Sequence, residues 1–329
     1  MRIALDAMGG DYAPTELVKG AVEAGRAYPD LNIALVGQPE AIKACGHELP
    51  PNVTIYPATE VVGMDEHPAT AVRRKKDSSI VVATRLVKEG KADAVVSAGS
   101  TGAQMAAALL GLGRIKGIER PAIATILPTA AGGKLMLDVG ANANAKAQHL
   151  YQYAVMGSIY AAKILNIANP KVGLLNIGSE ETKGSELSLA AHELLKKAPV
   201  NFIGNIEGRD VPQGVADVII CDGFVGNVVL KFAEGMAVTL FEMIKAQLMV
   251  TPLRKLGGAM VKPGLKEVAR VLDYSEYGGS PLLGVDGISI VCHGSSKAKA
   301  VRNAIKVAGE CAASGYLAEI KANLQEGQA

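Results

Sequence analysis

Short apolar runs rich in β-branched residues alternate with longer helical patterns along almost the whole chain. Several of these runs are apolar at successive positions, as expected for strands that are buried on both faces. This alternation restricts the fold more than any other feature, because it is typical of a mostly parallel sheet covered by helices. The pattern therefore predicts an α/β protein, a three-layer αβα sandwich.

The predicted strands occupy residues 2–5, 32–37, 53–58, 93–99, 122–128, 134–140, 171–178, 201–206, 217–223 and 287–294. The predicted helices occupy residues 14–27, 78–89, 101–113, 146–166, 184–197 and 295–321. A chain of 329 residues is long enough for two ordinary domains, but no repeat or linker divides it. We therefore expect a single two-lobed unit over residues 1–329.

The composition argues against several kinds of partner and location. Lys and Arg number 34 against 32 Asp and Glu, and aromatic residues make up 4% with no Trp. A broad nucleic-acid-binding surface is therefore not expected. The four cysteines share no CxxC spacing, which argues against a metal or disulfide framework and for reduced thiols in a cytosolic protein. No run approaches the ~18 unbroken apolar residues of a spanning helix, so we expect a soluble protein that can still touch a membrane.

Residues 227–265 break the alternation and are predicted to form a helical arm. Apolar residues recur at helical spacing from Val229 to Leu248, with charges on the other side, which indicates a long amphipathic helix. Pro252 is predicted to end this helix, and an apolar loop with scattered basic residues follows. Two compatible interpretations stay open: the helix packs on the core or on a second subunit, or the tip also touches a membrane. The proposed membrane contacts are Leu253, Leu256, Met260 and Val261.

The stretch LDAMGGDYAP places Gly9, Gly10 and Asp11 between the first strand and the first helix. Glycines there often cradle a phosphate, but the carboxylate of Asp11 would repel one, and GxGxxG is absent. We expect a tight turn in which Asp11 caps the helix that holds Pro14 in its first turn.

Two later loops are candidates for anion binding, because sites in α/β sheets form beyond the carboxyl ends of strands. In the first, SAGSTGA, backbone N–H groups and hydroxyls at the start of a helix suit an anion, although an N-capping turn explains them equally well. Its candidate residues are Gly99, Ser100, Thr101 and Gly102. In the second, NIGSEETKGSEL, Lys183 and Gly184 precede a helix, but Glu180 and Glu181 weaken an anion site there.

Three further strand ends carry polar residues that are candidates for catalysis or substrate binding. Asn142 and Asn144 follow a strand-ending glycine, and their neutral amides suit the orientation of a carbonyl or a phosphate. Asp222 and Asn227 begin the long helix, where Asp222 is expected to act as a cap. His293 ends the last strand, so it is either a proton donor or a structural histidine. The cysteines Cys221 and Cys292 lie within strands and are interpreted as small core residues.

Four consecutive basic residues precede the helix predicted at 78–89: Arg73, Arg74, Lys75 and Lys76. A solvated charge run is the simplest explanation. Against an acidic protein partner, the same residues would steer association. These observations together suit binding of a phosphate-bearing molecule and chemistry by positioning, but they do not identify a reaction.

Ten motifs, in order and in register over nearly the whole chain, resemble the phosphate acyltransferase family of bacterial phospholipid synthesis. They are ALDAMGGDYAP, AVRRKKDSS, SAGSTGA, IERPAI, LDVGAN, MGSIYA, VGLLNIGSEETKG, DGFVGNVVLK, YGGSPLLG and HGSS. The family usually has Asn where this chain has Ser100, and Asp where it has Asn144. The resemblance implies a homodimer with the fold of isocitrate and isopropylmalate dehydrogenases and of phosphate acetyltransferase, with no cofactor and no metal.

The resemblance also implies an activity: transfer of a fatty acyl group from acyl carrier protein to inorganic phosphate. The acyl phosphate would pass to a membrane glycerol-3-phosphate acyltransferase, so the protein would lie in the cytoplasm at the inner face of the membrane. In that scheme Lys183, Gly184 and the N–H groups of residues 99–102 bind phosphate, and residues 73–76 dock the carrier protein. Asn227 or Asn142 stabilises the thioester oxyanion, and His293 protonates the departing thiolate. Two rival hypotheses are a dehydrogenase of the related fold and a non-catalytic scaffold that binds acyl carrier protein or membrane.

Overall fold

The structure of the chain, a computed structural model, describes residues 1–326. The strands are β1 (Arg2–Asp6), β2 (Asn32–Gly37), β3 (Val53–Pro57), β4 (Ala94–Ser97), β5 (Ala122–Thr129), β6 (Gly132–Leu137), β7 (Lys171–Asn176), β8 (Asn201–Glu207), β9 (Val218–Ile220), β10 (Ser280–Leu283) and β11 (Ser289–Val291). The helices are α1 (Thr15–Ala27), α2 (Pro39–Ala44), α3 (Pro68–Arg74), α4 (Ser79–Lys88), α5 (Thr101–Gly111), α6 (Ala147–Ile164), α7 (Glu186–Leu195), α8 (Gly223–Leu248), α9 (Pro252–Leu272), α10 (Ala298–Ser314) and α11 (Tyr316–Glu326). A short 3-10 turn covers Tyr274–Glu276.

One sheet runs through both lobes in the order β3-β2-β1-β4-β11-β10-β5-β6-β9-β7-β8. Neighbouring strands are parallel except where β10 pairs with β11 and β5, and where β5 pairs with β6. These three reversals make β6, β9, β7 and β8 run opposite to β1, β2, β3, β4 and β11. The carboxyl ends of β1, β4 and β11 therefore lie at one edge, called here the first edge, and those of β6, β9 and β7 at the second edge.

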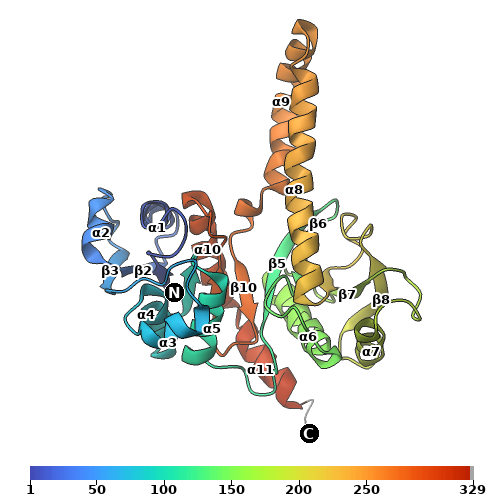
Figure 1. The fold of residues 1–329 in the computed structure, drawn as a ribbon, viewed down its shortest axis with the longest axis horizontal. Coiled ribbons are helices and arrows are strands. Elements are labelled where there is room, and N and C mark those ends of the chain that lie inside the picture. The colour runs from blue at the N-terminus through green and yellow to red at the C-terminus, as the bar shows by residue number, and fades with distance from the viewer. Residues whose placement is uncertain (327–329) are drawn as a thin grey trace.

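Helices cover both faces of the sheet, which confirms the three-layer αβα prediction. On one face α1, α10, α6, α7 and α11 enclose the largest hydrophobic core, which spans both lobes. On the other face α3, α4 and α5 cover the first lobe, and the start of α8 packs on β5 and β6. In Figure 1 the lobe of β1–β4 and the lobe of β6–β9 lie on either side of β10 and β5.

The arm is a hairpin of two helices, α8 and α9, which projects from the body (Figure 1). The predicted apolar loop after Pro252 is wrong, because those residues form α9. Thr251 caps α9 by accepting a hydrogen bond from the N–H of Arg254, and Pro252 fits the first turn, where no N–H partner is required. Leu248 packs near Gly258, so the two helices lie side by side.

The apolar side of the arm faces outward, and this decides one of the open alternatives. Val229 and Leu230 pack against the body, whereas Phe232, Met236 and Leu240 are exposed. Packing of the whole helix on the core of its own chain is therefore wrong, and contact with a second subunit or a membrane stays a prediction. Within residues 1–326, α8 is the helix whose length and apolar composition would suffice to cross a membrane, although it bears charges such as Lys231 and Glu234.

Two local predictions fail at glycine and proline positions. The helix expected over residues 295–321 divides into α10 and α11, because Gly315 takes a left-handed conformation with φ of 73° that ends α10. The expected cap by Asp11 is absent: Pro14 occupies the cap position of α1, without a side-chain cap. The N–H of Asp11 instead donates to the carbonyl of Gly294, which ties the turn after β1 to the loop after β11.

Candidate functional site

The first edge brings together the loops that follow β1, β4 and β11. Val291 lies opposite Ser97 in the parallel pair of β11 and β4, so His293 and Gly99 begin adjoining loops. The N–H of Cys292 donates to the carbonyl of Ser97 at 2.8 Å, which fixes that junction. These loops hold two of the predicted site segments, residues 99–102 and His293.

Asp6 organises the first edge from inside. Its carboxylate accepts a hydrogen bond from the hydroxyl of Ser97 at 2.7 Å and from the N–H of Met8 at 3.2 Å. Ser97 in turn accepts the N–H of Gly99 at 3.0 Å. Complete burial raises the pKa of Asp6, although hydrogen bonds, including that from Ser97, oppose the rise. Asp6 therefore positions both the turn after β1 and the loop that starts α5.

Residues 99–102 form the N-terminal turn of α5, as either interpretation requires. Ser100 is the cap, and its hydroxyl accepts the N–H of Ala103 at 3.5 Å. Close packing requires a glycine at position 102, because a Cβ there would lie 2.7 Å from Pro68 of α3. Thr101 is exposed at the helix start. The N-capping turn is thus confirmed, and phosphate binding by this turn stays a prediction.

His293 meets the arm helix at the first edge. Its Nδ1 lies 2.7 Å from the hydroxyl oxygen of Ser295, and its Nε2 lies 3.4 Å from Nζ of Lys231. Lys231 also forms an ion pair of 2.8 Å with Glu234, one turn further along α8. Lys231 therefore does more than belong to the charged side of an amphipathic helix. This lysine joins α8, which packs on β5 and β6, to the end of β11.

At the second edge, Asp138 has the corresponding role. Its buried carboxylate accepts the N–H groups of Gly140 at 3.1 Å, Ala141 at 2.9 Å and Asn142 at 2.7 Å. It also accepts the N–H of Ile123 from β5 at 3.1 Å. Asp138 thereby fixes the loop after β6 to the neighbouring strand.

Asn142 serves this loop rather than a substrate. Its amide nitrogen has three acceptors: the Pro121 carbonyl at 2.6 Å, the Tyr153 hydroxyl at 2.9 Å and Asp138 at 3.0 Å. An amide nitrogen carries two hydrogens, so none remains for an oxyanion. This arrangement gives the oxyanion role of Asn142 no support, and that role stays a prediction. Asn144 lies exposed further along the same loop.

The start of α8 holds Asn227 beside that loop. Asp222 caps the helix, as predicted, by accepting the N–H groups of Phe224 and Val225, each at 2.9 Å. Asn227 is exposed, and its Cγ lies 3.8 Å from the position that a Cβ on Gly140 would take. Four residues, about one helical turn, separate Asn227 from Lys231. The first turns of α8 therefore place Asn227 beside the loop after β6 and Lys231 beside the loop after β11.

Lys183 and Gly184 lie in the loop after β7, far from α5. The two strands are six places apart in the sheet, or about 29 Å at ~4.8 Å per strand, and their carboxyl ends lie at opposite edges. Lys183 is exposed, and its carbonyl accepts a hydrogen bond from Asn176 at 2.9 Å. Within one chain the structure therefore does not bring Lys183 beside residues 99–102, and phosphate binding by each stays a prediction.

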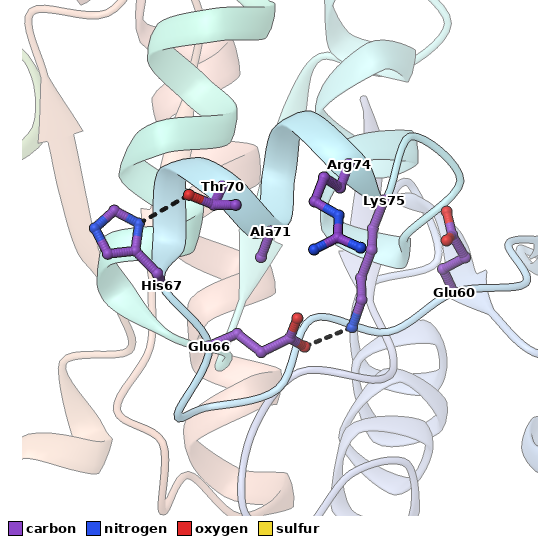
Figure 2. A pocket seen from close by; sticks show the side chains of 7 residues that line it. All are labelled: Glu60, Glu66, His67, Thr70, Ala71, Arg74 and Lys75. Atoms are coloured by element: carbon purple, nitrogen blue, oxygen red, sulfur yellow. Dashed lines mark hydrogen bonds and ion pairs between the residues drawn. The ribbon is translucent and has the colours of Figure 1, made fainter.

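The basic residues end α3, a helix that the sequence patterns did not reveal. Lys75 donates to the carbonyl of Val61 at 2.7 Å and pairs with Glu66 at 2.5 Å, as Figure 2 shows for the carboxylate. The pocket drawn there lies between α3 and residues 60–67. Arg73, Arg74 and Lys76 are exposed. Lys75 is thus committed to its own chain, and the other three remain candidates for docking.

The remaining predictions concern cysteines and metals. Cys221 and Cys292 are buried, as predicted, and burial raises the pKa of Cys292 to about 12. A thiol of that kind is protonated near neutral pH, so it is no nucleophile. Among residues 1–326, no cluster of three or more His, Cys, Asp or Glu side chains is arranged to hold a metal ion.

Comparison with known proteins agrees with this architecture. Residues 1–319 match a family described as fatty acid synthesis protein. The chain is 68% identical over 327 residues to a phosphate acyltransferase from Desulfitobacterium hafniense, which covers 98% of each chain. It is 61% identical over 328 residues to one from Heliobacterium modesticaldum, again covering 98% of each.

Solved structures show the fold at much lower identity. A phosphotransacetylase from Staphylococcus aureus superposes with a TM-score of 0.63 at 18% identity, covering 95% of this chain and 94% of that one. A 4-hydroxythreonine-4-phosphate dehydrogenase from Klebsiella pneumoniae gives 0.54 at 12% identity, covering 95% and 98%. The likeness to the dehydrogenase is one of fold alone, and it confirms the predicted dehydrogenase-like architecture.

The extent and identity of these matches define the class of protein: the chain is an acyltransferase. It belongs to the family of bacterial phosphate acyltransferases.

Proposed function

We propose that this protein transfers a fatty acyl group from the thioester of acyl carrier protein to inorganic phosphate, and that it releases acyl phosphate and the carrier thiol. The observation that carries the proposal is the convergence at the first edge. There the loop that starts α5 adjoins the loop of His293, and His293 contacts Lys231 of α8, in a member of this family. A helix N-terminus suits a phosphate, and a histidine suits the proton that a departing thiolate takes up.

The reaction needs placement more than activation, because phosphate dianion is already nucleophilic near neutral pH. A phosphate oxygen attacks the thioester carbonyl carbon, and the negative charge moves to the carbonyl oxygen. Asn227, whose exposed amide lies on the first turns of α8, donates to that oxyanion. The carbon–sulfur bond then breaks, and His293 gives its proton to the pantetheine sulfur. Because the amide of Asn142 is engaged within its own loop and Lys183 lies in the loop after β7, this scheme requires neither.

We further propose that the acidic carrier protein docks on Arg73, Arg74 and Lys76 beside the first lobe. Two copies of the chain pair as a homodimer, with the outward apolar side of the arm as one contact. The tip of the arm, with Leu253 and Leu256 each more than half exposed, lies on the inner face of the cell membrane. There the product reaches a membrane glycerol-3-phosphate acyltransferase, while the body stays in the cytoplasm.

One measurement tests the activity: phosphate-dependent release of free thiol from an acyl carrier thioester, without nucleotide or added metal. We expect release that saturates with phosphate, and acyl phosphate as the product trapped with hydroxylamine. A control with sulfate at equal ionic strength shows that phosphate is a reactant and does more than screen charge. Absence of release from a folded protein would favour a carrier-binding scaffold.

A further inference from the structure

Lys231 lies where the two blocks of the sheet meet. Its Nζ is 3.4 Å from Nε2 of His293 and 2.8 Å from Glu234. An ammonium has three N–H donors, so these two contacts do not exhaust its capacity. The lysine is half exposed, and its ion pair with Glu234 is of the surface kind, which contributes little and yields readily to a better anion.

The surroundings of Lys231 favour negative charge. The adjoining loop after β4 begins α5, an eleven-residue helix, whose N-terminus carries roughly half a positive charge. Nζ of Lys231 and Nε2 of His293 lie 3.4 Å apart, close enough for one phosphate to accept a hydrogen bond from each.

We infer that Lys231 is an anion-binding residue of the reaction site, which holds the attacking phosphate together with His293 and the N-terminus of α5. This inference rests on the proposed function and replaces Lys183 as the source of positive charge. Lys183 belongs to the second edge, whereas Lys231 crosses from α8 to the first edge. The ion pair with Glu234 holds the ammonium in place until phosphate arrives.

Binding of inorganic phosphate to the purified protein, measured by calorimetry without acyl substrate, tests the inference directly. We expect Lys231→Gln to weaken phosphate binding at least about tenfold, the size of one lost charge-assisted hydrogen bond. Lys231→Arg keeps the charge and should recover part of the affinity. Lys245→Gln removes a lysine further along the same helix, and its phosphate affinity should stay within about twofold of the unmodified protein.

Steady-state kinetics separate binding from support of His293. Loss of a phosphate ligand raises the Michaelis constant for phosphate, whereas loss of support for His293 alone lowers kcat and leaves that constant unchanged. Glu234→Gln, which keeps Lys231 and frees its ammonium, should tighten phosphate binding. It also gives a second measurement should Lys231→Gln fail to fold.

The outcomes distinguish this inference from the proposed function. Phosphate binding that depends on Lys231, in a protein that releases no thiol, would refute the acyl transfer and keep the anion site. Thiol release with an unchanged phosphate affinity in Lys231→Gln would overturn the inference and keep the reaction. Failure of the unmodified protein to bind phosphate in the calorimeter would also overturn it.

Discussion

Asp6 and Asp138 occupy equivalent places in the two oppositely directed blocks of the sheet. Each follows a buried leucine at the carboxyl end of its strand, and each accepts the N–H of the residue two positions later, at 3.2 and 3.1 Å. Each carboxylate also reaches a neighbouring strand, through Ser97 for Asp6 and through Ile123 for Asp138. A buried carboxylate that accepts hydrogen bonds from the following loop and binds a neighbouring strand therefore shapes the loops at both edges.

Burial of Asp6 predicts a pH-dependent stability. Because burial raises its pKa in the folded protein, its stabilising contribution is full below the unfolded value of about 3.9 and declines as pH rises through the folded value. The free energy of unfolding of the unmodified protein, relative to that of Asp6→Asn, should fall as pH increases above ~4. Urea unfolding of both proteins over a pH series measures this difference. Exposed Asp65→Asn provides the baseline, and a difference that rises with pH would contradict the prediction.

Asn142→Ala should lower stability, because it strips hydrogen bonds from the Asp138 carboxylate, the Pro121 carbonyl and the Tyr153 hydroxyl. We expect a loss of about 1–3 kcal/mol in the free energy of unfolding, read from chemical denaturation. Exposed Asn144→Ala, in the same loop, should change it by less than about 0.5 kcal/mol. Unchanged stability with a large loss of turnover in Asn142→Ala would restore its assignment to the oxyanion.

Asn227→Ala should reduce kcat by roughly 10²–10³-fold, or about 2.7–4 kcal/mol, the cost of one oxyanion donor. The residue is exposed, so the free energy of unfolding should hardly change. Initial rates of thiol release at saturating phosphate and acyl carrier thioester measure the effect. Val228→Ala, at the next exposed position of α8, serves as the matched control. Normal turnover in folded Asn227→Ala would remove this role.

Charge reversal at Arg73 and Arg74 should raise the Michaelis constant for acyl carrier thioester and leave that for phosphate nearly unchanged. These side chains are exposed at the end of α3, where we propose that they steer the carrier without touching the reacting atoms. The double variant Lys43→Glu/Lys197→Glu makes the same charge change elsewhere and should have little effect. Parallel increases in both constants, or equal effects of the two double variants, would speak against docking at this site.

Leu253→Glu with Leu256→Glu should abolish sedimentation with anionic lipid vesicles. The side chains are 80% and 63% exposed near the tip of the arm, where two carboxylates oppose insertion among lipids. Val268→Glu with Val271→Glu places the same charges near the base of α9. This variant should sediment with vesicles more than the tip variant does, close to the level of the unmodified protein. Undiminished sedimentation of the tip variant would exclude the tip as the membrane contact.

Much of the fold follows from local patterns in the sequence. The strand predicted at residues 32–37 matches β2 residue for residue, and nine other predicted strands overlap observed ones. The segments that escaped prediction are short or interrupted. β10 has four residues including a proline, and α3 has seven, too few for a periodicity to show. The segment after Pro252 is a helix because Pro252 fits its first turn behind the cap Thr251; Pro263 lies inside α9 without ending it.

The site was harder to predict, because its geometry depends on strand direction. A position after a strand groups residues such as Lys183 and Gly99 only where all carboxyl ends share one edge. The antiparallel insertion of β10 and β5 reverses half of the sheet, and no local pattern shows that reversal. Lys231 was missed for a related reason: its partner His293 is 62 positions away. The sequence carries one weak indication of the buried carboxylates: Asp6 and Asp138 each follow a leucine and precede a turn that contains glycine.

α8 is at once part of the candidate site and half of the arm, and this dual use limits how the chain can change. Each residue of a helix adds about 100° of rotation and 1.5 Å of length. A single insertion between Lys231 and Met249 would therefore turn the arm tip by more than a quarter circle relative to the first edge. We expect arms of different length in this family to differ by whole numbers of turns, with matching changes in α9. The reach of the arm would then evolve in steps, while Asn227 and Lys231 keep their direction.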